Sequence, residues 1–423
     1  NPNIGKINGN RPLHHFIGHA IFHEGAITAM AMEIHRLDHA SRRLLLLAAR
    51  GEWNDAQRAR AMLLARDVDD WNAFCEVAIR SFGACLAYRL LSTLDAGSIP
   101  GQALDRLQHV ARMLAVRSLQ IEGAMLDFSA GCLEPLGVRH AFFKGASLAH
   151  RYHAHPAARP SRDVDVLVDP AMALAVVRHA RQAGYTPVRQ VGPTERDLVR
   201  WMKQETVYGM RAPNGVLIEI HHSLDHGDGV LDNVRMLGRA EIIDYRGRML
   251  PVLRTSDLFV YMCMHHTRHF WSHLHWYADL DAIIAHPLFD LAEVREVAAS
   301  ARLDSTIEAC LQLHEFARSA DWPDTLSLER GASEALLARS VECLEGGPAR
   351  EVELRATRLS RDRAFAWQSS MSERAVLFVL RVRRRLEKQW RRITRGVARR
   401  LRSALKAGTD PHGGSGKSGG NRA

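Results

Sequence analysis

Residues 163–168 read Asp-Val-Asp-Val-Leu-Val, in which acidic residues alternate with aliphatic ones. Successive side chains of a β-strand point to opposite faces, so a period of two predicts a strand. Asp163 and Asp165 then share one face, while Val164 and Val166 enter the core. Two neighbouring carboxylates repel each other unless a cation lies between them, and Mg²⁺ is the usual cation in phosphoryl chemistry. The same pattern also fits an edge strand whose Asp side chains only face water.

A short apolar stretch that ends in a glycine turn precedes this strand. Residues 138–143 read Val-Arg-His-Ala-Phe-Phe, which is typical of a buried strand, and Lys144-Gly145-Ala146-Ser147 follows at the start of a helical stretch. Glycine lets backbone amides approach a phosphate, and a helix N-terminus favours the negative charge of the phosphate. Lys144 adds a point charge. The turn therefore predicts a phosphate-binding site that includes Lys144, Gly145 and Ser147.

A third acid follows downstream. Residues 206–211 and 215–221 flank Pro213-Asn214-Gly215, a strong signal for a β-hairpin turn. Glu219 lies in the second of these strands among aliphatic residues, where an unpaired charge would be costly. Three acids beside a phosphate-binding turn predict a site that binds metal ions and phosphate.

The region between residues 135 and 255 alternates strands and helices, whereas the patterns on both sides are helical. Before it, residues 71–94 predict a continuous apolar stripe along one helix. The predicted fold class is α+β, with a mixed sheet core between two helical regions. The predicted divisions are a helical N-terminal region (1–134), an α/β core (135–255), a helical C-terminal region (256–350), a basic amphipathic tail (351–407) and a flexible end (408–423).

The formal net charge of +10 is concentrated near the C-terminus. Residues 373–406 hold thirteen Lys or Arg and two acids, a net charge of +11, so the rest of the chain carries −1. Apolar residues recur through this segment at spacings of three and four, which predicts a cationic amphipathic helix. The helix is expected to bind anionic lipid, to bind RNA phosphates, or to pack its apolar stripe on the protein with the Arg side chains in solvent.

The six cysteines are scattered and form no CxxC pair, which favours a reducing cytoplasm over a disulfide framework or a zinc ribbon. The longest apolar runs are far shorter than the roughly 20 residues needed to cross a bilayer. We therefore expect a cytoplasmic protein without a transmembrane helix.

Together these motifs resemble the poorly characterised nucleotidyltransferase family of the DNA polymerase beta superfamily, which is found widely in bacteria. The matching residues are Phe143-Lys144-Gly145-Ala146-Ser147-Leu148, Tyr152, Arg159-Pro160-Ser161-Arg162, the strand 163–168, and Glu219-Ile220-His221. The resemblance implies a polymerase-beta-like core in which Asp163 and Asp165 bind two metal ions, Glu219 completes the triad, and Gly145 to Ser147 hold the triphosphate. The chain departs from the superfamily in its Gly-Ala-Ser turn, in the seventeen residues before the first Asp, and in having Glu rather than Asp as third acid.

The expected activity is in-line attack by an acceptor hydroxyl on the α-phosphate of a nucleoside triphosphate, with two Mg²⁺ ions, or Mn²⁺, as cofactors. Arg159 and Arg162 either stabilise the negative charge that develops during phosphoryl transfer, or are ordinary solvent-exposed residues of the loop. The acceptor could be a small molecule, a sugar, a protein side chain or RNA. The alternative is a catalytically silent nucleotide-binding or adaptor protein of a biosynthetic or toxin-antitoxin-like locus.

A cluster of five histidines lies between His265 and His275. His265, His269 and His273 follow a spacing of four, which would place them on one helical face where they could bind a transition metal. No HExxH motif is present, and similar His-rich helices occur in the resembling family. We therefore favour a helix that lines the nucleotide cleft over a zinc site. Asp279, shortly downstream, could equally face solvent.

Overall fold

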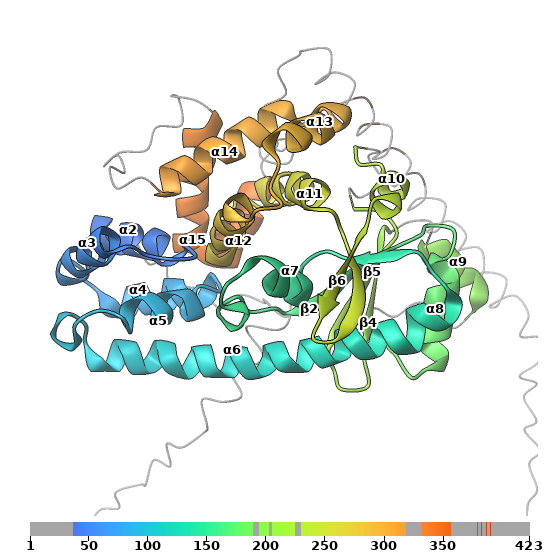
Figure 1. The fold of residues 1–423 in the computed structure, drawn as a ribbon, viewed down its shortest axis with the longest axis horizontal. Helices are drawn as coiled ribbons and strands as arrows, with labels where there is room; N and C mark the ends of the chain where they lie inside the picture. The colour runs from blue at the N-terminus through green and yellow to red at the C-terminus, as the bar shows by residue number, and fades with distance from the viewer. Residues whose placement is uncertain are drawn as a thin grey trace, which may run out of the picture. The chain divides into compact units, whose positions relative to one another are not determined.

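The computed structural model describes residues 37–188, 194–202, 205–224, 230–318 and 332–356, together with Val379, Val382, Leu386 and Trp390. Within the described residues, a mixed seven-stranded sheet lies between two sets of helices (Figure 1). The long helix α6 runs along one side of the sheet, and α11, α13 and α14 lie on the other. This arrangement confirms the predicted α+β class.

The N-terminal part of the described chain is helical, as predicted. Side-chain caps start several of its helices: Asp38 and Asp70 each accept hydrogen bonds from the first turn, and Asn54 forms a capping box with Gln57. The helices are α2 (His39–Ala48), α3 (Asp55–Arg66), α4 (Trp71–Arg80), α5 (Ala84–Leu91) and α6 (Gly101–Phe128).

The single helix predicted over residues 71–94 is wrong, because the structure breaks it between α4 and α5. Phe82 has a left-handed backbone (φ 58°), and the backbone N–H of Leu274 donates to the Ser81 carbonyl oxygen at 2.8 Å. A Cβ added at Gly83 would lie 2.3 Å from Leu274 Cδ2. The absent side chain at Gly83 therefore lets a distant segment pack against the break.

Seven strands form the sheet in the order β3-β4-β5-β2-β1-β7-β6. β2 pairs with β5 and β1 pairs with β7 in parallel, and the other pairs are antiparallel. The strands are β1 (His140–Phe142), β2 (Asp163–Val168), β3 (Thr186–Pro187), β4 (Val207–Arg211), β5 (Leu217–His221), β6 (Glu241–Tyr245) and β7 (Arg248–Val252). The intervening helices are α7 (Gly145–Tyr152), α8 (Ala173–Gln182), α9 (Glu195–Met202) and α10 (Asn233–Gly238).

The β4–β5 hairpin was predicted from its turn, but the β6–β7 hairpin was not. Its two-residue turn consists of Arg246 (φ 53°) and Gly247 (φ 83°), and a positive φ at both positions is the requirement of a type I′ turn. The Gly247 signal was present in the sequence, whereas Arg at the preceding position is unusual for this turn type. The hairpin completes the sheet because β7 pairs with β1.

One face of the sheet is buried in the main core. Val164, Val166, Ile218 and Ile220 belong to a cluster that also contains Phe128 at the end of α6. Because side chains alternate along a strand, the residues between these aliphatic positions point to the opposite face. The acidic residues of β2 and β5 lie at these positions.

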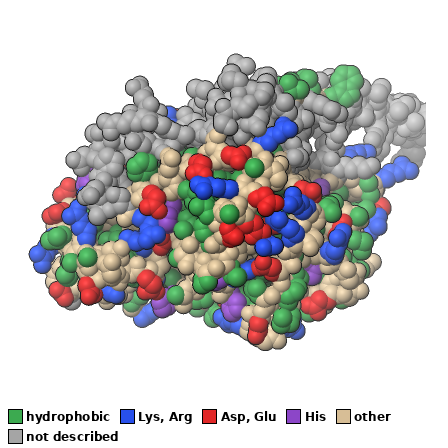
Figure 2. Space-filling model, turned by 45° about the horizontal axis from the view of Figure 1, so that its top comes forward, with side chains coloured by type: hydrophobic (Ala, Val, Ile, Leu, Met, Phe, Trp, Pro, Cys, Tyr) green, Lys and Arg blue, Asp and Glu red, His purple; other side chains and the backbone are tan. Residues whose placement is uncertain are grey.

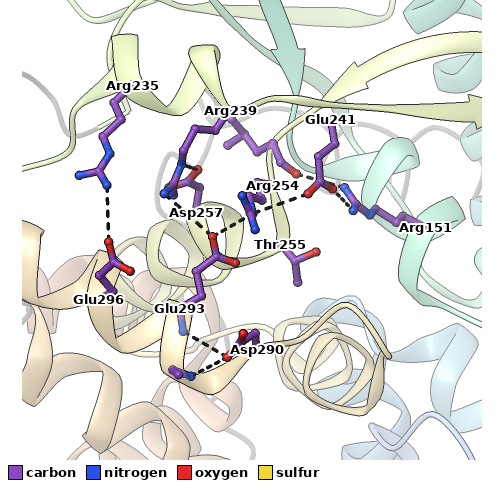
Figure 3. Close-up of polar contacts among 12 residues, drawn as sticks. Arg151, Arg235, Arg239, Glu241, Arg254, Thr255, Asp257, Asp290, Glu293 and Glu296 are labelled. Carbon is purple, nitrogen blue, oxygen red and sulfur yellow. Dashed lines mark hydrogen bonds and ion pairs between the residues drawn. The ribbon is translucent and has the colours of Figure 1, made fainter.

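The C-terminal helices are joined to the sheet by ion pairs (Figure 3). Arg254 Nε lies 2.9 Å from Glu293 Oε1 of α13 and 3.8 Å from Glu241 Oε1 of β6, and Glu241 also pairs with Arg151 of α7. Figure 2 shows acidic and basic side chains intermingled on one face of the molecule. The helices are α11 (Thr255–Arg268), α12 (Leu274–Ala285), α13 (Leu291–Ala301), α14 (Asp304–Arg318) and α15 (Ala332–Ala356).

Chain contacts divide the protein into two compact units, residues 1–369 and 370–423. Of the basic helix predicted over residues 373–406, only Val379, Val382, Leu386 and Trp390 are described, and all four are helical with exposed side chains. The rest of that helix lies outside the described residues, as does the flexible end predicted over 408–423. None of the helices described is long and apolar enough to span a membrane.

Candidate active site

The pairing of β2 with β5 brings the predicted acids together. In this parallel pair Asp165 lies beside Glu219, and Leu167 lies beside His221. Residues opposite each other in paired strands point to the same face, and so do residues two apart along one strand. Asp163, Asp165, Glu219 and His221 therefore share the face of the sheet opposite the main core.

His221 and Lys144 both contact the central acid of this group. His221 Nε2 lies 2.9 Å from Asp165 Oδ1 and 3.5 Å from Glu219 Oε2, and Lys144 Nζ lies 3.4 Å from the same Asp165 oxygen. One ligand atom from each of Asp165, Glu219 and His221 lies within 4.8 Å of the other two. Among the described residues this is the group of three potential ligands that could hold a metal ion.

The two aspartates of β2 have opposite electrostatic environments. Burial raises the pKa of Asp163 to about 7, and the charges of Asp165 and Glu219 add to this effect. Burial would also raise the pKa of Asp165, but Lys144 and the hydrogen bond from His221 outweigh it and hold that pKa below its ordinary value. The negative charge of Asp165 is therefore compensated by Lys144 and His221, whereas that of Asp163 is not compensated. A bound cation would stabilise the ionised form of Asp163.

This excess charge predicts that Asp163→Asn stabilises the metal-free protein at alkaline pH. A carboxyl group whose folded pKa is raised contributes stability that is complete below its ordinary pKa and is lost as pH rises through about 7. In EDTA, the variant should melt about 3 °C or more above the wild type at pH 8, with a clearly smaller difference at pH 5. Thermal unfolding at both pH values in EDTA measures this, and a lower melting temperature at pH 8 would count against it.

The predicted phosphate turn depends on glycine at its first helical position. Gly145 has a left-handed backbone (φ 58°), and an added Cβ would lie 3.2 Å from the Asp163 carbonyl oxygen and 3.3 Å from Ser161 Oγ. Ser147 was predicted to contact the triphosphate, but its buried hydroxyl donates to the Lys144 carbonyl oxygen at 2.9 Å. The buried Ser161 hydroxyl, which was not predicted as a site residue, has no hydrogen-bond partner among the described residues and faces the turn.

We expect Gly145→Ala to weaken nucleotide binding about five- to thirtyfold. A side chain costs roughly 1–2 kcal/mol in this conformation and approaches Asp163 and Ser161, so the turn should shift away from the geometry that accepts phosphates. Fluorescent nucleotide titration measures the effect. Gly123→Ala is the matched control, since Gly123 is an exposed residue near the C-terminal end of α6 with nothing within 4 Å of the added Cβ. The control should leave nucleotide affinity unchanged and stabilise the protein by about 1 kcal/mol. Equal nucleotide affinities for the two variants would show that the Gly145 turn does not take part in nucleotide binding.

The two arginines predicted at the site have different environments. Arg159 is buried, and its guanidinium makes a bidentate ion pair with Asp279 at 2.8 and 2.9 Å. Asp279 is fully buried rather than solvated and also contacts His153 Nε2 at 2.9 Å. Arg162 is half-buried, and its guanidinium lies 4.8 Å from the centre of the Phe82 ring. Arg162 is therefore the arginine with a guanidinium that a ligand could reach.

The continuous helix predicted through the histidine cluster is wrong. α11 ends at Arg268, Phe270 and Trp271 both have left-handed backbones (φ 53° and 50°), and α12 begins at Leu274. Consecutive left-handed aromatic residues are strained and persist only where the surrounding structure holds them. His265 and His269 therefore do not share a helical face with His273.

The histidines instead form an aromatic cluster beside the acids. The ring of His265 stacks on Tyr261 with centroids 5.4 Å apart, and the Tyr261 ring lies 5.3 Å from Lys144 Nζ. His269 Nδ1 lies 2.6 Å from Glu351 Oε1. Burial, together with the charge of Lys144, holds the pKa of His265 well below its ordinary value, so this ring is neutral. His265 thus packs against Tyr261, a neighbour of Lys144 that the sequence did not indicate. That the α11 histidines line a nucleotide cleft stays a prediction.

His221 is the main site residue that the sequence analysis did not select. Its signal was present, since it lies two residues after Glu219 in the same strand and therefore on the same face. Its contact with Asp165 depends on the register of β2 and β5, which the sequence did not give.

A separate open groove of about 640 Å³ runs along the edge strand β6. Its polar residues pair with one another, since Arg151 contacts Glu241 and His150 Nε2 lies 2.9 Å from the Asp244 carbonyl oxygen. The acids of β2 and β5 do not line it. The groove is therefore separate from the candidate site at the acids.

Comparison with known proteins bears on the chemistry of this site. A family model described as "Uncharacterised nucleotidyltransferase" matches residues 67–317, which include Asp163, Asp165 and Glu219. No curated protein matches the chain. One similar solved structure is an antigenic nucleotidyltransferase-like protein from Paracoccidioides brasiliensis, with 12% identity and a TM-score of 0.24 over 47% of this chain and 91% of that chain.

Proposed function

Because the chain belongs to the uncharacterised nucleotidyltransferase family, we propose that it transfers a nucleoside monophosphate from a nucleoside triphosphate to an acceptor hydroxyl. The observation that carries this proposal is the convergence of Asp163, Asp165 and Glu219 on one face of the sheet, beside the Gly145 turn. Carboxylates clustered in this way are typical of enzymes that transfer phosphoryl groups with bound metal ions.

The residues present fit divalent metal ions. Carboxylate oxygens are the ligands that Mg²⁺ prefers, and the raised pKa of Asp163 reflects an excess of negative charge that a cation would relieve. Asp163, Asp165 and Glu219 would hold two Mg²⁺ or Mn²⁺ ions. His221 would orient Asp165 through its 2.9 Å hydrogen bond, a frequent role of residues around metal ligands. Bound metal would neutralise phosphate oxygens and favour ionisation of the attacking hydroxyl.

The chain's own groups would place the triphosphate and the acceptor. The N-terminus of α7 offers backbone N–H groups to the phosphates, and Gly145 allows their close approach. Arg162 would stabilise charge that develops on the α-phosphate. The acceptor oxygen forms a bond to the α-phosphorus as the bond to the β-phosphate oxygen breaks, pyrophosphate leaves, and a carboxylate of the site takes the hydroxyl proton.

The test is incubation of the protein with each α-labelled nucleoside triphosphate, Mg²⁺ and cell extract, with measurement of pyrophosphate release and of label transfer. We expect both signals for the wild type and neither for Asp163→Asn. Nucleotide binding without transfer for all four nucleotides would favour the alternative of a silent nucleotide-binding or adaptor protein.

We also propose that the segment 373–406 binds an anionic surface, either RNA or membrane, on the basis of its net charge of +11. Deletion of residues 373–423 should abolish binding to both RNA and anionic vesicles, and the binding of the full chain should fall steeply with salt. Nucleotidyl transfer to a small acceptor should survive the deletion. Unchanged polyanion affinity after truncation would exclude the tail as the contact surface.

A further inference from the structure

Lys144 lies inside the acidic site rather than at its edge. It is the last residue before α7, and its side chain is 17% exposed. Its ammonium nitrogen lies 3.4 Å from Asp165 Oδ1, and the Asp165 side chain is 4% exposed. The contact is therefore a largely buried ion pair between the phosphate turn and the central acid.

Two aromatic rings enclose the ammonium group further. Lys144 Nζ lies 5.3 Å from the centre of the Tyr261 ring and 5.4 Å from that of Phe143, within the range of cation–π attraction. Tyr261 packs edge-on against Phe143 with centroids 5.2 Å apart. A carboxylate and two aromatic faces thus form a binding site for one cation, and the chain fills it with its own lysine.

A metal ion at this site would be held by a carboxylate oxygen of Asp165, the side chain that Lys144 already contacts. Asp165 Oδ1 already accepts contacts from His221 Nε2 at 2.9 Å and Lys144 Nζ at 3.4 Å. A divalent ion held by Asp165 and Glu219 would lie within a few ångströms of the ammonium group, and like charges at that separation repel strongly. We therefore expect the ion pair and the metal ion to compete for Asp165.

We propose that Lys144 is the resident counter-ion of the acidic site, and that a divalent metal ion binds only by displacing it. The proposal rests on the proposed function in placing a metal ion at these acids. The displaced ammonium remains tethered next to Gly145, where the triphosphate would bind. The Lys144 ammonium group thus pairs with Asp165 in the metal-free protein and with the phosphates in the protein that has bound metal and nucleotide.

The first test measures Mn²⁺ affinity of the metal-free protein by electron paramagnetic resonance, without nucleotide. Lys144→Met should bind Mn²⁺ at least about tenfold more tightly than the wild type, because the competing cation is gone. Arg162→Gln is the matched control: it removes the same unit charge beside Asp163, but from a guanidinium that lies over the Phe82 ring. Displacement predicts a distinctly smaller gain for the control. Equal gains in Mn²⁺ affinity for the two variants would mean that any loss of positive charge near the acids has this effect, and would overturn the proposal.

The second test uses the unaltered protein and is independent of how Lys144→Met folds. Acetylation by an amine-reactive ester, followed by mass spectrometry, gives the modification rate of Lys144 in EDTA and in Mg²⁺. We expect slow modification in EDTA and a rate several-fold higher in Mg²⁺, with no such change at Lys388. A Lys144 rate that Mg²⁺ leaves unchanged or lowers would overturn the proposal.

The failures of the two proposals are distinguishable. If the wild type transfers labelled nucleotide and binds Mn²⁺, but Lys144→Met binds Mn²⁺ no more tightly, only the role of Lys144 is wrong. If the wild type neither binds Mn²⁺ nor transfers nucleotide, the proposed function fails and the displacement proposal fails with it.

Discussion

Replacement of Asp165 by Asn should reduce nucleotidyl transfer by on the order of 10³-fold. Metal ions stabilise the transition state of phosphoryl transfer by several kcal/mol, and about 1.4 kcal/mol corresponds to a factor of ten in rate. Asp165 is the acid that lies beside Glu219 in the paired strands and contacts both His221 and Lys144. Pyrophosphate release at saturating nucleotide measures the loss.

Substitution of Asp165 and of Asp163 should change the stability of the metal-free protein in opposite directions. Asp165→Asn removes the charge that compensates the buried Lys144 and the hydrogen-bonded His221, so the metal-free protein should lose about 1–3 kcal/mol. Asp163→Asn should abolish transfer as well but stabilise the metal-free protein at pH 8, as derived above. Variants that lose activity with stability changes of the same sign would contradict the asymmetric electrostatics of the site.

Replacement of Asp279 by Ala should destabilise the protein by about 3–5 kcal/mol. The substitution leaves the Arg159 guanidinium buried without its bidentate partner and removes the contact with His153. Asp279 belongs to α12, whereas Arg159 belongs to the loop that leads into β2. The ion pair therefore holds the loop that precedes β2, and chemical denaturation measures the effect of its removal.

The control for Asp279→Ala is a double variant, Arg159→Met with Asp279→Leu. Replacing both partners of a buried pair by apolar residues of similar volume is often close to neutral, so most of the stability should return. Arg162→Gln should instead weaken nucleotide binding and leave the melting temperature almost unchanged. A stability loss below about 1 kcal/mol for Asp279→Ala would mean that the buried pair does not hold the loop.

Features that depend on local sequence were predicted well. The alternation of residues 163–168 predicted β2 and the shared face of its two acids, and Pro213-Asn214-Gly215 predicted the β4–β5 hairpin. Gly145 was predicted at a phosphate turn, where the structure gives it a left-handed backbone. A strand period, a hairpin turn and a glycine turn each follow from a few neighbouring residues, which is why the sequence alone indicated them.

Features that depend on distant partners were not predictable in this way. The break at Phe82 accommodates Leu274, and the burial of Arg159 depends on Asp279. Both partners lie more than a hundred residues away in the sequence. The predicted helix through the histidines fails at Phe270 and Trp271, whose left-handed backbones no local propensity favours. Tertiary packing overrides local preference at these positions.

We propose that the acids on β2 and β5 hold the metal ions of the reaction. A crystal structure with Mn²⁺ and a non-hydrolysable nucleoside triphosphate, with anomalous difference maps, tests it most directly. We expect manganese peaks bound by Asp163, Asp165 and Glu219, with the phosphates at the Gly145 turn and Lys144 moved away from Asp165. Manganese at the histidines of α11, or a triphosphate bound away from the Gly145 turn, would contradict it.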